Sequence, residues 1–238
     1  MNHLFALTIL SLGLAAAQTA QPPTWSGLLQ PTLEAKQQAC EAAVAYEKAH
    51  PTPAGQKYVG GDQSDAVRLG RRLVDDRDSP PEVKLPAGLV NRIIIQLPMA
   101  SVANMCGNAA YAGKTVKVGQ YLAVTLVYIQ GELVALKDAL TLTASLRLLD
   151  AYGKELARIE SLRDAAAKVD QALWTRECQG NVCRWRGFSV FRFHDPLKPE
   201  LYAATQTVQL VFDRGYGPET RDYTAADFTK LTMGGNGK

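Results

Sequence analysis

Apolar and polar residues alternate most regularly in the stretch Thr141–Leu149. Every second side chain of this stretch is apolar: Leu142, Ala144, Leu146 and Leu148. A period of two is that of a β-strand with one face buried. Asp150 and Gly153 follow, and these residue types are favoured at the first and fourth positions of a type I turn. The pattern therefore predicts a hairpin whose second strand is Glu155–Ser161.

The pairing within this hairpin leaves two alternatives. Counting outward from the turn, Leu148 lies opposite Leu156, as a core pair should. Two residues further on, however, Leu146 lies opposite Arg158. Either a bulge near Ala157 shifts the second strand, or Arg158 lies at the edge of the sheet with its stem on the core and its charge in water.

The same period continues through most of the chain after residue 88. Further candidate strands are Arg92–Leu97, Tyr121–Ile129, Leu133–Leu136, Leu173–Cys178, Cys183–Phe193 and Thr205–Phe212. Nearly every residue of Tyr121–Ile129 is apolar, so both faces of that strand should be covered and it should be central. Many short strands with frequent turn signals predict a mainly β fold, an antiparallel β-sandwich.

Before residue 88 the period is helical. A helix should begin after Pro31 with Thr32 as its cap, and its inward stripe should comprise Leu33, Cys40, Ala43, Val44 and Glu47. A second helix is predicted for Ser64–Val74, and Asp75–Pro86 reads as an extended linker because of its prolines. Two short helical segments are expected later, at Asp164–Leu173 and Thr224–Leu231.

These changes of pattern divide the chain. Residues 1–17 have the length and the small-residue ending of a signal peptide, with cleavage after Ala17 as the first choice and after Ala20 as the second. Residues 18–88 form a helical N-terminal segment, in which 18–30 are expected to be a loose leader. Residues 89–231 form the β-sandwich, and 232–238 are a disordered tail. No later apolar run reaches the roughly 20 residues of a transmembrane helix.

Charge gives little indication of a partner. The chain has 26 Lys and Arg against 23 Asp and Glu, so its net charge is 26 − 23 = +3. A balance this small does not favour nucleic acid or another polyanion.

The segment Gly113–Leu126, GKTVKVGQYLAVTL, resembles the entry to many bacterial immunoglobulin-like domains. The resemblance implies that the sandwich is of the immunoglobulin-like kind. We therefore expect an immunoglobulin-like β-sandwich preceded by a helical N-terminal segment.

Four cysteines in an exported chain are read first as two disulfides. Of the three possible connectivities we favour Cys178–Cys183, which would join the two strands of a hairpin, and by elimination Cys40–Cys106. The second bridge would tie the N-terminal region to the β domain.

The hairpin closed by Cys178–Cys183 is the most specific local feature. If these cysteines lie opposite each other, Glu177 faces Arg184 in an ion pair and Arg176 faces Trp185 in a cation–π pair. A ligand-binding surface for a sugar or an anionic polymer would use Trp174, Arg176, Arg184, Trp185 and Arg186. The alternative, which we favour, is a stapled hairpin with solvated arginines and inward tryptophans.

Motifs for catalysis, cofactors or metals are weak. Gly107–Thr115, GNAAYAGKT, has five residues before its Gly-Lys pair where a P-loop needs four, so we expect a polar loop between strands. The groups Asp62/Asp65 and Asp75/Asp76/Asp78 lack a complete calcium-loop pattern and are interpreted as helix caps. We assign no catalytic residue, no metal site and no cofactor.

The sequence thus predicts an extracytoplasmic, non-enzymatic protein, either a binding module or a structural component of the bacterial cell envelope. Its partner would be an envelope polysaccharide or protein. Two alternatives stay open: a hydrolase of an envelope polymer that uses carboxylates or His194, and an assembly or chaperone-like partner acting by strand addition.

Overall fold

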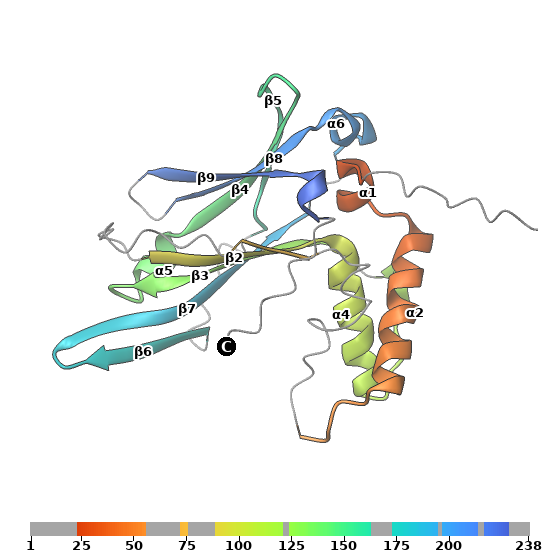
Figure 1. The fold of residues 1–238 in the computed structure, drawn as a ribbon, viewed down its shortest axis with the longest axis horizontal. Helices are drawn as coiled ribbons and strands as arrows, with labels where there is room; N and C mark the ends of the chain where they lie inside the picture. The colour runs from red at the N-terminus through yellow and green to blue at the C-terminus, as the bar shows by residue number, and fades with distance from the viewer. Residues whose placement is uncertain are drawn as a thin grey trace, which may run out of the picture.

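The computed structural model describes residues 23–55, 72–75, 89–120, 124–162, 173–194, 197–213 and 217–228. Two antiparallel sheets and a pair of helices dominate it (Figure 1). The larger sheet has the order β1-β2-β3-β7-β6, with β1 (Arg72–Asp75), β2 (Leu89–Gln96), β3 (Thr125–Leu133), β6 (Trp174–Gln179) and β7 (Val182–Phe193). The smaller has the order β5-β4-β8-β9, with β4 (Thr143–Leu149), β5 (Glu155–Glu160), β8 (Thr207–Asp213) and β9 (Pro218–Thr224).

The main core lies between the two sheets. Its buried residues include Val127 and Ile129 of β3, Leu146 and Leu148 of β4, and Phe212 of β8. Strand β3 is central, between β2 and β7, as the apolar run Tyr121–Ile129 predicts. It spans Thr125–Leu133, however, and only alternate residues are buried, so the expected burial of both faces is not found. The expected mainly β fold with antiparallel sheets is therefore confirmed.

The β4–β5 hairpin settles the choice between the two pairings. Its turn is the one predicted: the Asp150 carboxylate accepts hydrogen bonds from the backbone N–H groups of Tyr152 and Lys154, at 2.8 and 2.9 Å, and Gly153 has φ 78°. The register then shifts next to Leu148, which lies opposite Ala157. The bulge alternative is thus correct, and it places Ile159, not Arg158, opposite the core residue Leu146.

The described part of the expected loose leader, residues 23–30, is not loose but contributes Trp25 and Leu28 to the core. Helix α1 (Trp25–Leu29) is capped by Thr24 and lies against α6 (Pro199–Ala204) and the 3₁₀ turn η3 (Ala225–Phe228). Trp25 is 3% exposed, donates a hydrogen bond from Nε1 to the Gln206 carbonyl at 3.0 Å, and packs edge-on against Phe228. Burial of this aromatic side chain fixes α1 at one end of the core.

Two longer helices form a separate unit beside the sheets (Figure 1). Helix α2 (Leu33–Ala49) begins at its predicted cap Thr32, and its buried face includes Cys40 and Ala43. It packs on α4 (Pro98–Tyr111), which was not predicted. The expected loop Gly107–Thr115 is wrong, because its first five residues complete α4.

Other parts of the sequence interpretation need correction. Leu33 was expected to face inward but is 51% exposed, whereas the predicted burial of Glu47 is found. The predicted strand Leu133–Leu136 is wrong: β3 ends at Leu133, and a bend leads into α5 (Asp138–Thr141). Within the predicted helix Ser64–Val74, residues 72–74 belong to β1.

Several predictions concern residues outside the described ranges. These are the signal peptide, most of Ser64–Val74 and of Asp164–Leu173, and the C-terminal tail. The predicted last helix, Thr224–Leu231, coincides with η3 over residues 225–228. The division of the chain into domains stays a prediction.

Candidate functional site

The β6–β7 hairpin extends away from the body of the protein (Figure 1). Its strands are joined by the two-residue turn Gly180-Asn181, in which Gly180 has φ 60°. Strand β3 pairs with β7 only as far as Trp185, so residues 182–184 pair with β6 alone. Cys178 and Cys183 are disulfide-bonded, with their Cα atoms 4.0 Å apart. This bridge, together with Cys40–Cys106, gives the two pairs that the sequence favours.

The register of the hairpin agrees with the prediction, but it separates the five proposed binding residues. Glu177 lies opposite Arg184, and Arg176 lies opposite Trp185. Because side chains alternate across a strand, Arg176 and Trp185 share one face with Trp174, while Arg184 and Arg186 lie on the other. The proposed residues therefore do not form one continuous surface, and ligand binding by them stays a prediction.

The tryptophan face belongs mainly to the core. Trp174 is 5% exposed and clusters with Leu133 and Ala139, and Trp185 packs against the same cluster. The Trp174 ring lies over Gly187, the residue opposite it on β7. Arg176 is exposed, and the structure describes no ring contact between it and Trp185. The tryptophans are accordingly anchors of the hairpin.

The opposite face of the hairpin carries a compact set of charges, which we call the charged face: Glu132, Glu177, Arg184 and Arg186. Arg186 donates from Nε to Glu132 at 3.0 Å and from Nη1 to Glu177 at 2.8 Å. Arg184 lies 3.5 Å from the second oxygen of Glu132. Hydrogen bonding by Glu132 and the charge of Glu177 hold the pKa of Arg186 above its ordinary value.

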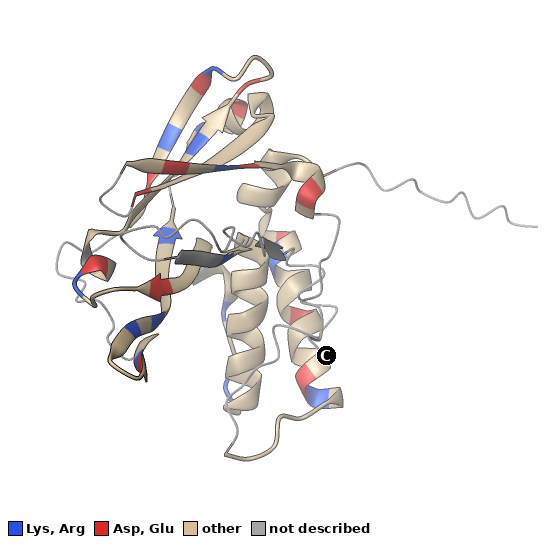
Figure 2. Ribbon diagram, turned by 60° about the vertical axis from the view of Figure 1, so that its left-hand side comes forward, with Lys and Arg blue, Asp and Glu red and all other residues tan. Residues whose placement is uncertain are grey.

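The charged face differs from the predicted one in two respects. Glu177 pairs with the diagonal Arg186, not with Arg184 opposite it. Glu132 was not predicted, because it comes from β3 and meets the arginines only through the register Glu132↔Arg186. Two carboxylates balance two guanidinium groups, so this face is not a basic patch; Figure 2 shows acidic and basic positions side by side in this hairpin.

A second set of polar side chains crosses the outer face of the smaller sheet. Arg147 of β4 lies between Glu155 of β5, with which it forms an ion pair, and Gln209 of β8, to which it donates at 2.7 Å. Gln209 in turn donates to Asp222 of β9 at 2.8 Å. Hydrogen bonding to Arg158, with help from Arg147, holds the pKa of Glu155 below its ordinary value. We call these residues the polar row.

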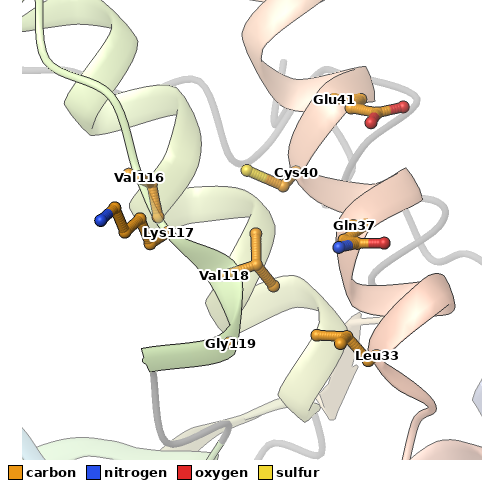
Figure 3. Close-up of a pocket in the computed structure, with 8 residues that line it drawn as sticks. All are labelled: Leu33, Gln37, Cys40, Glu41, Val116, Lys117, Val118 and Gly119. Atoms are coloured by element: carbon orange, nitrogen blue, oxygen red, sulfur yellow. The ribbon is translucent and has the colours of Figure 1, made fainter.

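Two surface grooves are lined by described residues. One, of about 540 Å³, lies between α2 and the segment containing η1 (Val118–Gln120), beside the Cys40–Cys106 bridge (Figure 3). The other, of about 750 Å³, lies against the start of α6. Among the described residues that line them, the first groove has one acidic side chain, Glu41, and the second has one, Glu200. Glycoside hydrolysis by paired carboxylates requires two such groups in one site.

The remaining candidate residues are scattered. His50 stacks on Tyr46 with ring centroids 4.6 Å apart, and His194 directly follows β7. Asp75 is the last residue of β1, while the other members of the two acidic groups lie outside the described ranges. Within the described ranges, no cluster of three or more His, Cys, Asp or Glu residues could hold a metal ion.

A scan against protein-family models, a search of curated proteins and a search of solved structures each found no match. Among the helices that the structure describes, none is long and apolar enough to cross a membrane. The two disulfides are consistent with an extracytoplasmic protein.

Proposed function

We propose that this protein is an exported, non-enzymatic binding or structural component of the bacterial cell envelope, and that it makes contact with its partner through the tip of the β6–β7 hairpin. The observation that carries the proposal is the projection of this hairpin, whose end pairs with no other described strand and is closed by a disulfide. We further propose that the two sheets form an immunoglobulin-like sandwich that supports it.

The construction of the hairpin suits binding. Val182, next to the turn, is 58% exposed, and Gln179 and Asn181 are exposed beside it. The disulfide and the ion pairs of the charged face hold this tip in one conformation before any partner arrives. A preorganised surface loses less conformational entropy on binding, which favours affinity for a given contact area.

The chemistry of the tip favours an envelope polysaccharide or protein as the partner. An apolar side chain surrounded by amides, with paired charges behind it, resembles the mixed composition of ordinary recognition surfaces. The balanced charges do not favour a polyanion. The two disulfides, together with the signal peptide that the sequence predicts, support a location outside the cytoplasm.

The test compares two substitutions that each place a carboxylate at an exposed apolar position. The mature protein is incubated with envelope isolated from its native cells, separated into cell-wall polymer and membranes, and the sedimenting fraction is measured. We expect Val182→Asp to abolish sedimentation, because it places an unpaired charge in the contact. Leu33→Asp is the matched control: Leu33 is 51% exposed but lies on α2, so binding should be unchanged.

Two results would contradict the proposal. Equal sedimentation of the wild type and both variants would show that the tip is not the contact. Release of soluble fragments from the cell-wall polymer by the wild-type protein would instead show a hydrolase.

A further inference from the structure

The free edge of β6 offers a second kind of contact. We propose that this edge binds an extended segment of another polypeptide, which adds to the larger sheet as a sixth strand beyond β6. The inference rests on the proposed function, since it identifies the partner of this hairpin as a protein chain. Beyond β6, the described part of the chain places no other strand or helix.

The direction of the backbone groups on β6 follows from a contact of its neighbour. The carbonyl of Arg192 in β7 accepts a hydrogen bond from Leu162 N–H at 2.7 Å. Because β3 occupies one side of β7 at this point, with Leu126 opposite Arg192, this carbonyl is inferred to point to the other side. In an antiparallel ladder the N–H and C=O of one residue point the same way, and the direction alternates along the strand. The backbone N–H and C=O groups of the even-numbered residues of β7 therefore point towards β6, because the pairing of β7 with both neighbours is regular from end to end.

This alternation determines which groups of β6 are left on the open edge. Thr175, Glu177 and Gln179 lie opposite even-numbered residues of β7 and bond to them. The N–H and C=O groups of the other three residues of β6 then point outward: Trp174, Arg176 and Cys178. The short Cα separation of 4.0 Å at Cys178–Cys183 agrees, because pairs without mutual hydrogen bonds are the closer ones. Six backbone groups are thus available to an added strand.

The other edges are less suitable for pairing. Strand β5 has a bulge next to its turn, and bulges twist an edge away from a partner. Strand β9 begins with Pro218, which has no N–H to donate. Strand β6 has neither feature, and its register is regular up to the disulfide. Strand β1, the other edge of the larger sheet, has only four residues, and very short edge strands pair poorly. Strand β6 is therefore the edge best prepared to add a strand.

Charge argues against a second copy of this chain as the occupant. In an antiparallel pair of two β6 strands, residues whose backbone groups point to the open edge must lie opposite residues of the same kind in the other copy. The symmetric registers that use the whole strand then centre on Arg176 or on Glu177. Each places a charged residue opposite its own copy, which is destabilising. The added strand should therefore come from a different sequence.

Arg176 indicates the chemistry of that sequence. Its side chain is exposed and forms no ion pair with the described carboxylates, whereas Glu177 is paired with Arg186. An acidic residue opposite Arg176 would form a cross-strand ion pair. A basic residue opposite Glu177, on the other face, would complete the match. The partner segment is thus extended, with an acidic and a basic residue side by side.

The test uses the blocked hexapeptide Thr-Val-Lys-Glu-Val-Thr, in which Glu lies opposite Arg176 and Lys opposite Glu177 when the strands are antiparallel. Amide hydrogen exchange of the full protein is followed by NMR at millimolar peptide concentration. We expect slower exchange at the Arg176 and Cys178 amides and no change at the Glu177 amide, which already bonds to β7. The same peptide with N-methyl groups at Glu and at alternate residues cannot pair, and should protect neither amide.

A charge exchange provides the second arm. Arg176→Glu should weaken binding of the Glu peptide by about tenfold, since an attractive cross-strand pair becomes a repulsive one. A peptide with a second Lys in place of Glu should restore the affinity to this variant. Protection by the N-methylated peptide, or no protection by the original one, overturns the inference. If the original peptide gives no protection but Val182→Asp still abolishes envelope binding, the proposed function stands and only the inference of a protein strand as the partner is wrong.

Discussion

Replacing Gly187 by alanine should be one of the most damaging single-methyl changes in this protein. Gly187 lies opposite Trp174, where the hairpin joins the core. A Cβ atom at this position would overlap the Leu173 carbonyl oxygen, and would lie 2.8 Å from the Trp174 Cα and 2.9 Å from the Trp174 Cδ2. Two of these three atoms are backbone, so side-chain rotation alone cannot relieve the overlap.

The expected cost can be estimated from overpacking. Inserting a methyl group into a packed core costs about 1–3 kcal/mol, and occasionally more. Because two backbone atoms must move, we expect a loss at the upper end, about 3 kcal/mol. For a chain of this size that corresponds to a fall in Tm of roughly 6–12 °C. The ring of Trp174 should also be displaced towards water.

Urea unfolding of the wild type and Gly187→Ala, followed by far-UV circular dichroism and by tryptophan fluorescence, measures both effects. The matched control is Gly119→Ala, since no atom lies within 4 Å of a Cβ built on Gly119. We expect the control to unfold within about 0.5 kcal/mol of the wild type. If Gly187→Ala is as stable as the control, the Trp174 packing described above is wrong.

Two further predictions concern the polar row and the helix pair. Glu155→Gln should lower the free energy of unfolding at pH 7 by up to about 1 kcal/mol, because Arg147 and Arg158 then lie opposite each other without a carboxylate between them. Folding lowers the pKa of Glu155, so the difference in free energy of unfolding between wild type and variant should shrink as the pH falls below the ordinary glutamate pKa, about 4.3. Below the lowered pKa the difference should be absent. Denaturation across this pH range measures it, and a difference that stays constant would refute the assignment. Replacing both Cys40 and Cys106 by serine should lower the free energy of unfolding by about 4 kcal/mol, the chain-entropy estimate for a separation of 66 residues. Chemical denaturation measures this loss. A loss below about 1 kcal/mol would show that the bridge constrains the unfolded chain little.

The sequence predicts best those features that depend on near neighbours in the chain. The Asp150–Gly153 turn, the Thr32 cap and the Cys178–Cys183 hairpin each require only a few adjacent residues of particular types. Their backbone conformations follow from local hydrogen bonding and from φ preferences. These features are found as predicted.

The features that were missed depend on contacts between distant residues or lack a clear period. Helix α4 is built largely from small residues, and its buried positions Ala103, Cys106 and Gly107 give little hydrophobic contrast. Strand β9 is polar on most positions because it lies at a sheet edge, and only Tyr223 is buried. Helix α1 lies in the stretch that the sequence predicts to be a loose leader, because five residues are too few to show a helical period.

The charged face could not be predicted for a related reason. The ion pairs of Glu132 arise from the register of β3 against β7, which brings together Glu132 and Arg186, 54 positions apart in the chain. No local pattern determines that register. The hairpin sequence alone therefore predicts the Cys178–Cys183 staple but not Glu132, the acid that β3 supplies to its arginines.

The pairing of the four cysteines follows the order in which they occur in the chain, first with second and third with fourth. In the export proposed above, a chain that crosses the membrane from its N-terminus presents Cys40 first and Cys106 next, so these two can be oxidised together before the others arrive. Cys178 and Cys183 then emerge together, with no competing free thiol left. An oxidant that joins cysteines as they appear would thus make the native bonds directly, and the protein should mature without a disulfide isomerase.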